Sequence, residues 1–163
     1  MTDVPADRPK FPVRLEMNGE KVAGAVLPDE TLLEWLRDRG CTSVRGSCGI
    51  GICGTCTVLV NERTVSSCIA LAGDVDGARV RTAETMEDDE ILQKTREAFV
   101  DNSAFQCSYC IPGMVLSVNA CIEQNPDCSS EDVREFLGGN LCRCGTYPQV
   151  LDVIRDLTRE KRR

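Results

Sequence analysis

The chain has 163 residues, of which 42% are hydrophobic and 28% are charged, and its formal net charge is −7. This length suits one ordinary domain or two small ones. No run approaches the roughly 18 consecutive apolar residues of a membrane span, and an acidic chain lacks the clustered Lys and Arg of a nucleic-acid surface. Because residues 1–10 contain no apolar stretch, we expect no secretory signal and a cytoplasmic location.

The chain contains 11 cysteines and no histidine. Without histidine there is no Ser-His or Cys-His nucleophile pair, no His-ligated zinc and no Rieske-type centre. Eleven is an odd number, so a complete disulfide framework would leave one thiol over. In a reducing compartment a cysteine-rich pattern indicates metal binding, and a disulfide scaffold is the least favoured alternative.

The first half predicts a mixture of strands and one short helix. Alternation of Val13, Leu15 and Met17 with polar residues is typical of a half-buried strand, and Asn18-Gly19 is typical of a hairpin turn. In chain order the expected elements are strands 13–17 and 22–27, a helix over 32–36 capped by Thr31, and a second hairpin of strands 57–60 and 64–66.

The second half predicts four short helices, which would suit a small bundle. Their apolar faces fall at 91–99, 114–122, 133–137 and 150–157, with Pro112 and Pro148 at helix starts and Ser129 with Asp132 as a capping box. The acidic stretch 84–90 separates the two halves. We therefore expect two domains, 11–86 and 87–158.

The first group of cysteines surrounds a glycine-rich loop. Cys48, Cys53 and Cys56 have the spacing C-x4-C-x2-C of plant-type [2Fe–2S] sites, and Cys68 is the expected fourth ligand. Positive φ at the loop glycines would let backbone amides approach sulfur; these glycines are Gly46, Gly49, Gly51 and Gly54. Structural zinc is a minor alternative, since it usually takes two short cysteine knuckles. Cys41 is a rival fourth ligand, which we expect to be a packed thiol instead.

The second group has the spacing C-x2-C…C-x-C, formed by Cys107, Cys110, Cys142 and Cys144. Both pairs precede predicted helix starts, where unpaired amides and the helix dipole stabilise thiolates. This pattern indicates a second iron–sulfur cluster. A thioredoxin-like dithiol is less favoured because this half lacks a βαβ pattern. We expect two further cysteines to be non-ligands: Cys121, a packed thiol, and Cys128, a loop thiol.

The two sets together resemble the iron–sulfur subunit of the molybdenum hydroxylases, the family of xanthine dehydrogenase, aldehyde oxidoreductase and carbon monoxide dehydrogenase. The resemblance covers residues 13–157. It depends on the Cys48–Cys68 set, on Gln-Cys-x-x-Cys-x-Pro-Gly at 106–113 and on Asn-Leu-Cys-Arg-Cys at 140–144. It implies an α+β fold, in which a β-grasp ferredoxin-like domain precedes an all-α four-helix domain and each domain holds one [2Fe–2S] cluster.

The resemblance also implies partners. The C-terminal cluster would lie beside a molybdopterin-type molybdenum cofactor in a large subunit, with Gln106 and Cys144 approaching the pterin. The N-terminal cluster would face FAD, usually in a medium subunit, within a heterotrimer or a dimer of heterotrimers. Substrate would be oxidised at molybdenum, and electrons would pass through the C-terminal and then the N-terminal cluster to FAD or an external acceptor. This chain would carry no substrate-converting site and no residue that is catalytic by itself.

Two departures from the family pattern lie in the second set. The family commonly has Gly-Phe where this chain has Ser108-Tyr109, and Thr-Gly where it has Gly145-Thr146. We hypothesise that both alter hydrogen bonding at the cluster, and with it the potential or the pterin contact. A free-standing ferredoxin-like carrier is the alternative function, although the helical half and Gln106 argue against it.

Overall fold

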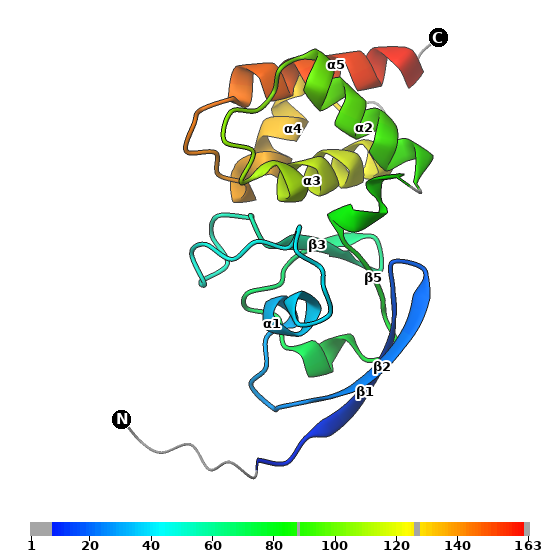
Figure 1. Cartoon of the computed structure of the whole chain (residues 1–163). Coiled ribbons are helices and arrows are strands. Elements are labelled where there is room, and N and C mark those ends of the chain that lie inside the picture. The colour runs from blue at the N-terminus through cyan, green and yellow to red at the C-terminus, as the bar shows by residue number, and fades with distance from the viewer. Residues whose placement is uncertain (1–7, 88, 126–127, 162–163) are drawn as a thin grey trace.

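The structure is a computed structural model that describes residues 8–87, 89–125 and 128–161. A sheet-containing half lies below a helical half in the view of Figure 1. The first half contains β1 (Phe11–Met17), β2 (Glu20–Val26), α1 (Leu32–Arg37), β3 (Thr57–Val60), β4 (Arg63–Ser66), η1 (Ala72–Val75) and β5 (Arg79–Arg81). The connection η2 (Ala83–Glu87) leads to α2 (Glu90–Asp101), α3 (Ile111–Gln124), α4 (Ser130–Phe136), η3 (Leu137–Gly139) and α5 (Tyr147–Lys161). The predicted α+β class is confirmed.

The five strands form one mixed sheet in the order β2-β1-β5-β3-β4. β1 and β5 are parallel, whereas the other neighbouring pairs are antiparallel. The sequence pattern does not predict β5, because three residues are too few to display alternation and the strand exists only through its pairing with β1 and β3. The helix α1 packs on this sheet through Leu32, Trp35 and Leu36, which are fully buried in the first hydrophobic core. This arrangement is a β-grasp.

The helical half is organised around α3, whose residues 113–122 are all buried. The helices α2, α4 and α5 pack around it, and the resulting core includes Leu92, Phe99 and Val153. The capping box of Ser129 with Asp132 is present at the start of α4, as predicted. None of the helices in the described ranges has the length and apolar character required to cross a bilayer.

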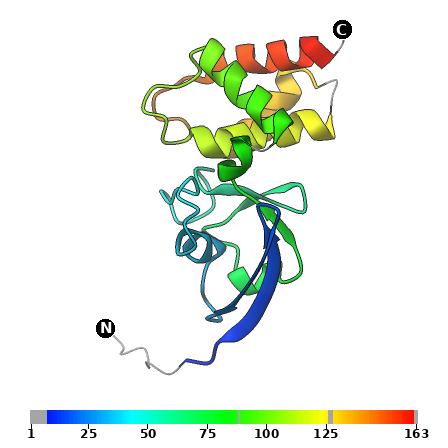
Figure 2. The ribbon, with the colours of Figure 1, turned by 45° about the vertical axis from the view of Figure 1, so that its right-hand side comes forward.

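The two halves share buried surface. Leu59 of β3 and Ala83 of η2 are buried in the core of the helical half rather than in that of the sheet. Both Figure 1 and the rotated view in Figure 2 place α3 directly above β3. The junction predicted near residue 86 falls in η2, and the domain boundaries themselves stay a prediction.

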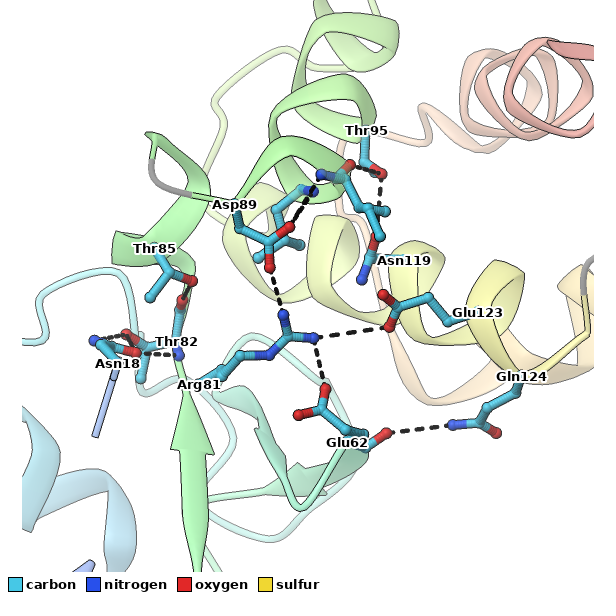
Figure 3. A network of polar contacts seen from close by, with 12 residues as sticks. Asn18, Glu62, Arg81, Thr82, Thr85, Asp89, Thr95, Asn119, Glu123 and Gln124 are labelled. Atoms are coloured by element: carbon cyan, nitrogen blue, oxygen red, sulfur yellow. Dashed lines mark hydrogen bonds and ion pairs between the residues drawn. The ribbon is translucent and has the colours of Figure 1, made fainter. Parts of the chain in front are cut away.

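A polar network around Arg81 also joins the halves (Figure 3). The Arg81 guanidinium contacts Glu62 of the β3–β4 turn at 2.6 Å and Glu123 of α3 at 3.7 Å. It also contacts Asp89, whose carboxylate caps the first amides of α2. In addition, Gln124 donates to the backbone carbonyl of Glu62 at 3.5 Å. One cation from the sheet therefore neutralises carboxylates on two helices.

Replacing Arg81 with glutamine should destabilise the protein, because three carboxylates would face one another without a cation. Since the Arg81 side chain is only 22% exposed, we expect a loss of about 2 kcal/mol, which lowers Tm by about 4–8 °C in a chain of this size. Thermal unfolding followed by circular dichroism measures the change. The control is Arg134→Gln, which removes an exposed pair within α4 and should cost under about 1 kcal/mol; equal shifts would contradict the prediction.

Candidate metal centres

The first set of cysteines surrounds the loop between α1 and β3. The β3–β4 hairpin brings Cys56 and Cys68 together at its open end, where the Ser67 amide donates to the Cys56 carbonyl at 3.3 Å. The Cys53 thiol affects the pKa of Cys48, and the Cys56 thiol affects that of Cys68, so each of these two pairs of sulfurs lies close together. The four predicted residues are therefore neighbours, arranged as two pairs of sulfurs.

Backbone amides of the loop point at sulfur, as predicted. The amides of Ile52 and Cys53 each donate to Cys48 Sγ at 3.4 Å. The turns that achieve this have positive φ at Gly49 (68°), Gly51 (75°) and Gly54 (68°). The prediction of positive φ at Gly46 is wrong; its role is different, because its carbonyl accepts a hydrogen bond from Tyr109.

The thiols of this first set differ in acidity. The amides of Ile50, Cys53 and Ile52 lower the pKa of Cys48 to about 6. Burial raises the pKa of Cys68 to about 11. Cys48 is consequently a thiolate at neutral pH, whereas Cys68 must lose its proton when a metal binds.

The second set comes from two loops, 102–110 before α3 and 140–146 before α5, which lie at the same end of the helical half in Figures 1 and 2. The Cys144 thiol affects the pKa of Cys107, and the Cys142 thiol affects that of Cys110, so the sulfurs of these pairs lie close together. Cys110 is the N-cap of α3 and is buried, as is Cys142. Cys107 is exposed and Cys144 is half-buried, so one edge of this set faces outward.

The environment again lowers the pKa of some thiols and raises that of others. The amide of Tyr109, followed by the Cys144 thiol, lowers the pKa of Cys107. Burial alone would raise the pKa of Cys142, but the hydroxyl and amide of Thr146 with other donors lower it to about 7. Burial, together with Cys142, raises the pKa of Cys110 to about 12.

Two threonine hydroxyls lie against cysteine sulfurs, one in each set. Thr55 Oγ1 is 3.3 Å from Cys53 Sγ, and Thr146 Oγ1 is 3.3 Å from Cys142 Sγ. The second contact involves Thr146 of the Gly145-Thr146 inversion, for which the sequence suggested altered hydrogen bonding at the second set. The first is absent from the sequence-based predictions, although a hydroxyl inside Cys-Gly-Thr-Cys is a signal that could have identified it.

The loops of the two sets are in direct contact. The amide of Leu141, next to Cys142, donates to the carbonyl of Cys53 at 2.9 Å. The Asn140 side chain donates to the Gly54 carbonyl at 3.1 Å. A Cβ at Gly113 of α3 would lie 2.3 Å from that same carbonyl oxygen, so glycine is required for this approach. One hydrogen bond thus connects a cysteine of the first set to the neighbour of a cysteine of the second.

Arg45 and Tyr109 form a second bridge between the loops. Arg45 donates to the carbonyls of Ser108 at 2.7 Å and Tyr109 at 3.1 Å. In return, the Tyr109 hydroxyl donates to the Gly46 carbonyl at 2.7 Å. The Tyr109 hydroxyl therefore binds the loop of the other set, and the hypothesis that Tyr109 influences a cluster potential stays a prediction, which Tyr109→Phe and a midpoint measurement would test.

The other three cysteines lie in the cores. Cys41 is buried and donates to the Met17 sulfur at 3.7 Å. Cys121 and Cys128 are both buried in the helical core, where burial and Cys128 raise the pKa of Cys121 to about 12. All 11 cysteines are free thiols, so a disulfide scaffold is not the basis of this fold.

The paired sulfurs fit a binuclear cluster. Within the described ranges no group of three or more His, Cys, Asp or Glu side chains could hold a single metal ion. A [2Fe–2S] cluster does not need such convergence, because each of its two irons takes two cysteine thiolates and the sulfides bridge between them. Each set offers two thiol pairs and backbone amides that act on sulfur.

Comparison with known proteins agrees with this donor chemistry. Residues 15–92 match the model of a 2Fe-2S iron-sulfur cluster binding domain, and residues 82–155 match that of a [2Fe-2S] binding domain. The chain is 37% identical to the nicotinate dehydrogenase small FeS subunit of Eubacterium barkeri, with 90% of this chain and 94% of that protein covered. It is 38% identical to the nicotine 6-hydroxylase small subunit of Paenarthrobacter nicotinovorans, with 95% and 93% covered.

Among solved structures, quinoline 2-oxidoreductase from Pseudomonas putida 86 contains a chain that matches with a TM-score of 0.86 and 31% identity. The match covers 94% of this chain and 96% of that one. Sequence and fold therefore agree over nearly the whole length. The chain belongs to the [2Fe–2S] iron–sulfur small subunits of the molybdenum hydroxylase family, which includes those of xanthine dehydrogenase and aldehyde oxidoreductase.

Proposed function

We propose that this chain holds one [2Fe–2S] cluster in each cysteine set and relays electrons between the two within a molybdenum hydroxylase complex. The N-terminal ligands are Cys48, Cys53, Cys56 and Cys68, in unit 11–86. The C-terminal ligands are Cys107, Cys110, Cys142 and Cys144, in unit 87–158. When bound, each cluster takes up and releases one electron. The chain's own residues bind the irons, orient sulfur and place the two sites next to each other.

The observation that carries the proposal is the contact between the two loops. Leu141 donates to the carbonyl of Cys53, and Cys142 follows Leu141 directly. The path from one proposed ligand to the other consequently consists of backbone and a single hydrogen bond. Two independent metal sites would not require this contact, whereas an electron relay benefits from it.

The exposed edges of the two sets suggest where partners dock. Gln106 and Cys107 are exposed beside half-buried Cys144, which is where a molybdopterin held by a large subunit would approach. On the first loop Ile50 and Ile52 are 64% and 57% exposed, and this apolar rim would meet a medium subunit that carries FAD. We propose a heterotrimer, or a dimer of heterotrimers, in the cytoplasm. Electrons would enter at the C-terminal cluster, near Gln106, and leave from the N-terminal cluster, near Ile50.

Electron paramagnetic resonance of the dithionite-reduced native protein tests the proposal, with iron and acid-labile sulfide assayed in the same sample. We expect two distinguishable [2Fe–2S] signals and about four irons and four sulfides per chain. A single signal would contradict the assignment of the second cysteine set as ligands of a cluster. Zinc without sulfide would exclude a redox role. Gel filtration tests the partners, since a free-standing carrier would elute alone.

A further inference from the structure

The contact between Thr146 and Cys142 is buried. Thr146 is 3% exposed and Cys142 is 9% exposed. The distance from Oγ1 to Sγ is 3.3 Å, and either atom could be the donor while the cysteine is a free thiol. Because water does not reach this hydroxyl freely, its hydrogen bond to sulfur persists in the folded chain.

Metal ligation decides the direction of this hydrogen bond. A cysteine bound to iron is a thiolate and has no proton to donate. The Thr146 hydroxyl must then donate to the Cys142 sulfur. A tight turn holds the two groups in contact, because Gly145 has a φ of 77° and its amide donates to the Cys142 carbonyl at 3.2 Å.

A donor on a ligand sulfur favours the reduced state of an iron–sulfur cluster. Reduction adds one negative charge, part of which resides on the sulfurs, and a hydrogen bond to sulfur becomes stronger as that charge grows. The reduction potential therefore rises. In a buried site the low local dielectric enlarges the effect.

Thr55 provides a comparison within the same chain. Its hydroxyl lies at the same 3.3 Å from a sulfur, that of Cys53, but Cys53 is more exposed than Cys142. Solvent screening should make the effect of Thr55 smaller. The two contacts form a matched pair, one in each set.

We infer that Thr146 is a positioning residue that raises the reduction potential of the C-terminal cluster through its hydrogen bond to Cys142, and that Thr55 does the same more weakly for the N-terminal cluster. This inference rests on the proposed function. Its consequence is that the site nearest the molybdenum subunit becomes the better electron acceptor. The Gly145-Thr146 order, in which this chain departs from the family's common motif, supplies the hydroxyl.

The experiment uses the intact complex and redox titrations followed by electron paramagnetic resonance. Thr146→Val keeps the size of the side chain and removes the hydroxyl, so the midpoint of the C-terminal cluster should fall while that of the N-terminal cluster stays constant. Thr146→Ser should restore the parent value. Thr55→Val, the matched control, should lower only the N-terminal midpoint, and by less.

An unchanged C-terminal midpoint in Thr146→Val, or a Thr146→Ser variant that behaves like valine, would overturn the inference. Should the valine variant fail to load iron, resonance Raman spectra of the parent complex decide instead. Transfer to D2O should shift the iron–sulfur stretches of the C-terminal cluster equally in the parent and in Thr146→Ser, and the absence of a shift would reject a hydroxyl donor. If the parent complex lacks two [2Fe–2S] signals, the proposed function itself fails, which is a different result.

Discussion

Replacing Cys142 with alanine should remove one of two paramagnetic signals and reduce the iron content from about four to about two atoms per chain. The substitution leaves one iron with a single protein thiolate, that of Cys110, its partner in the structure. The N-terminal signal should persist, because its ligands come from a different loop. Metal analysis and electron paramagnetic resonance of the purified variant measure both effects.

The matched control for this experiment is Cys121→Ala. Cys121 lies in the same half and is equally buried, yet it belongs to neither set. Loss of its sulfur should lower stability modestly, by about 1 kcal/mol, and leave both signals intact. A Cys142→Ala protein with four irons, or a Cys121→Ala protein lacking a cluster, would contradict the ligand assignment.

Replacing Gly113 with alanine should destabilise the contact between the halves although alanine favours a helix. In isolation the change would stabilise α3 by about 1 kcal/mol. In this protein the new Cβ would lie 2.3 Å from the Gly54 carbonyl oxygen, and backbone cannot move away as a flexible side chain could. Overpacking of this kind costs about 1–3 kcal/mol or more, so we expect a net loss of stability and a disturbed N-terminal signal, since Gly54 follows Cys53.

Gly138→Ala is the control for this steric effect. A Cβ at Gly138 would meet no atom within 4 Å, and its φ lies outside the left-handed region. In thermal unfolding, the Tm values of the two variants should differ by about 2–4 °C for each kcal/mol of difference in their free energy of unfolding. Equal Tm values, with unchanged spectra, would mean that the halves separate easily at this contact.

Cysteine spacing was the most informative local signal. Clusters of this type need thiolates at short, characteristic separations, so Cys48, Cys53 and Cys56 point to their chemistry without any knowledge of the fold. Likewise, Ser129 and Asp132 predict the start of α4, because a capping box is formed by residues three positions apart. Cysteine spacing and helix caps depend on residues a few positions apart, so both can be predicted from the sequence alone.

Features that depend on distant residues could not be predicted in this way. The strand β5 pairs with β1 across more than sixty positions, as in the register of Glu16 with Arg79. Arg81 acquires its three carboxylate partners only after both halves fold. Tyr109 illustrates the same limit, because nothing next to it in the sequence shows that the fold brings the Gly46 carbonyl of the other loop within 2.7 Å of its hydroxyl.

The bonds from Asn140 and Leu141 to the first loop have a consequence for how the protein is made. Asn140 is 86 positions away from Gly54, whose carbonyl it binds. On the ribosome, the first loop therefore emerges long before the residues that brace it. We expect the N-terminal cysteines to lie in an unbraced loop until residues 140 and 141 have been synthesised and have folded against it. Iron insertion at the first set would then follow synthesis of the second set rather than accompany synthesis of the first loop.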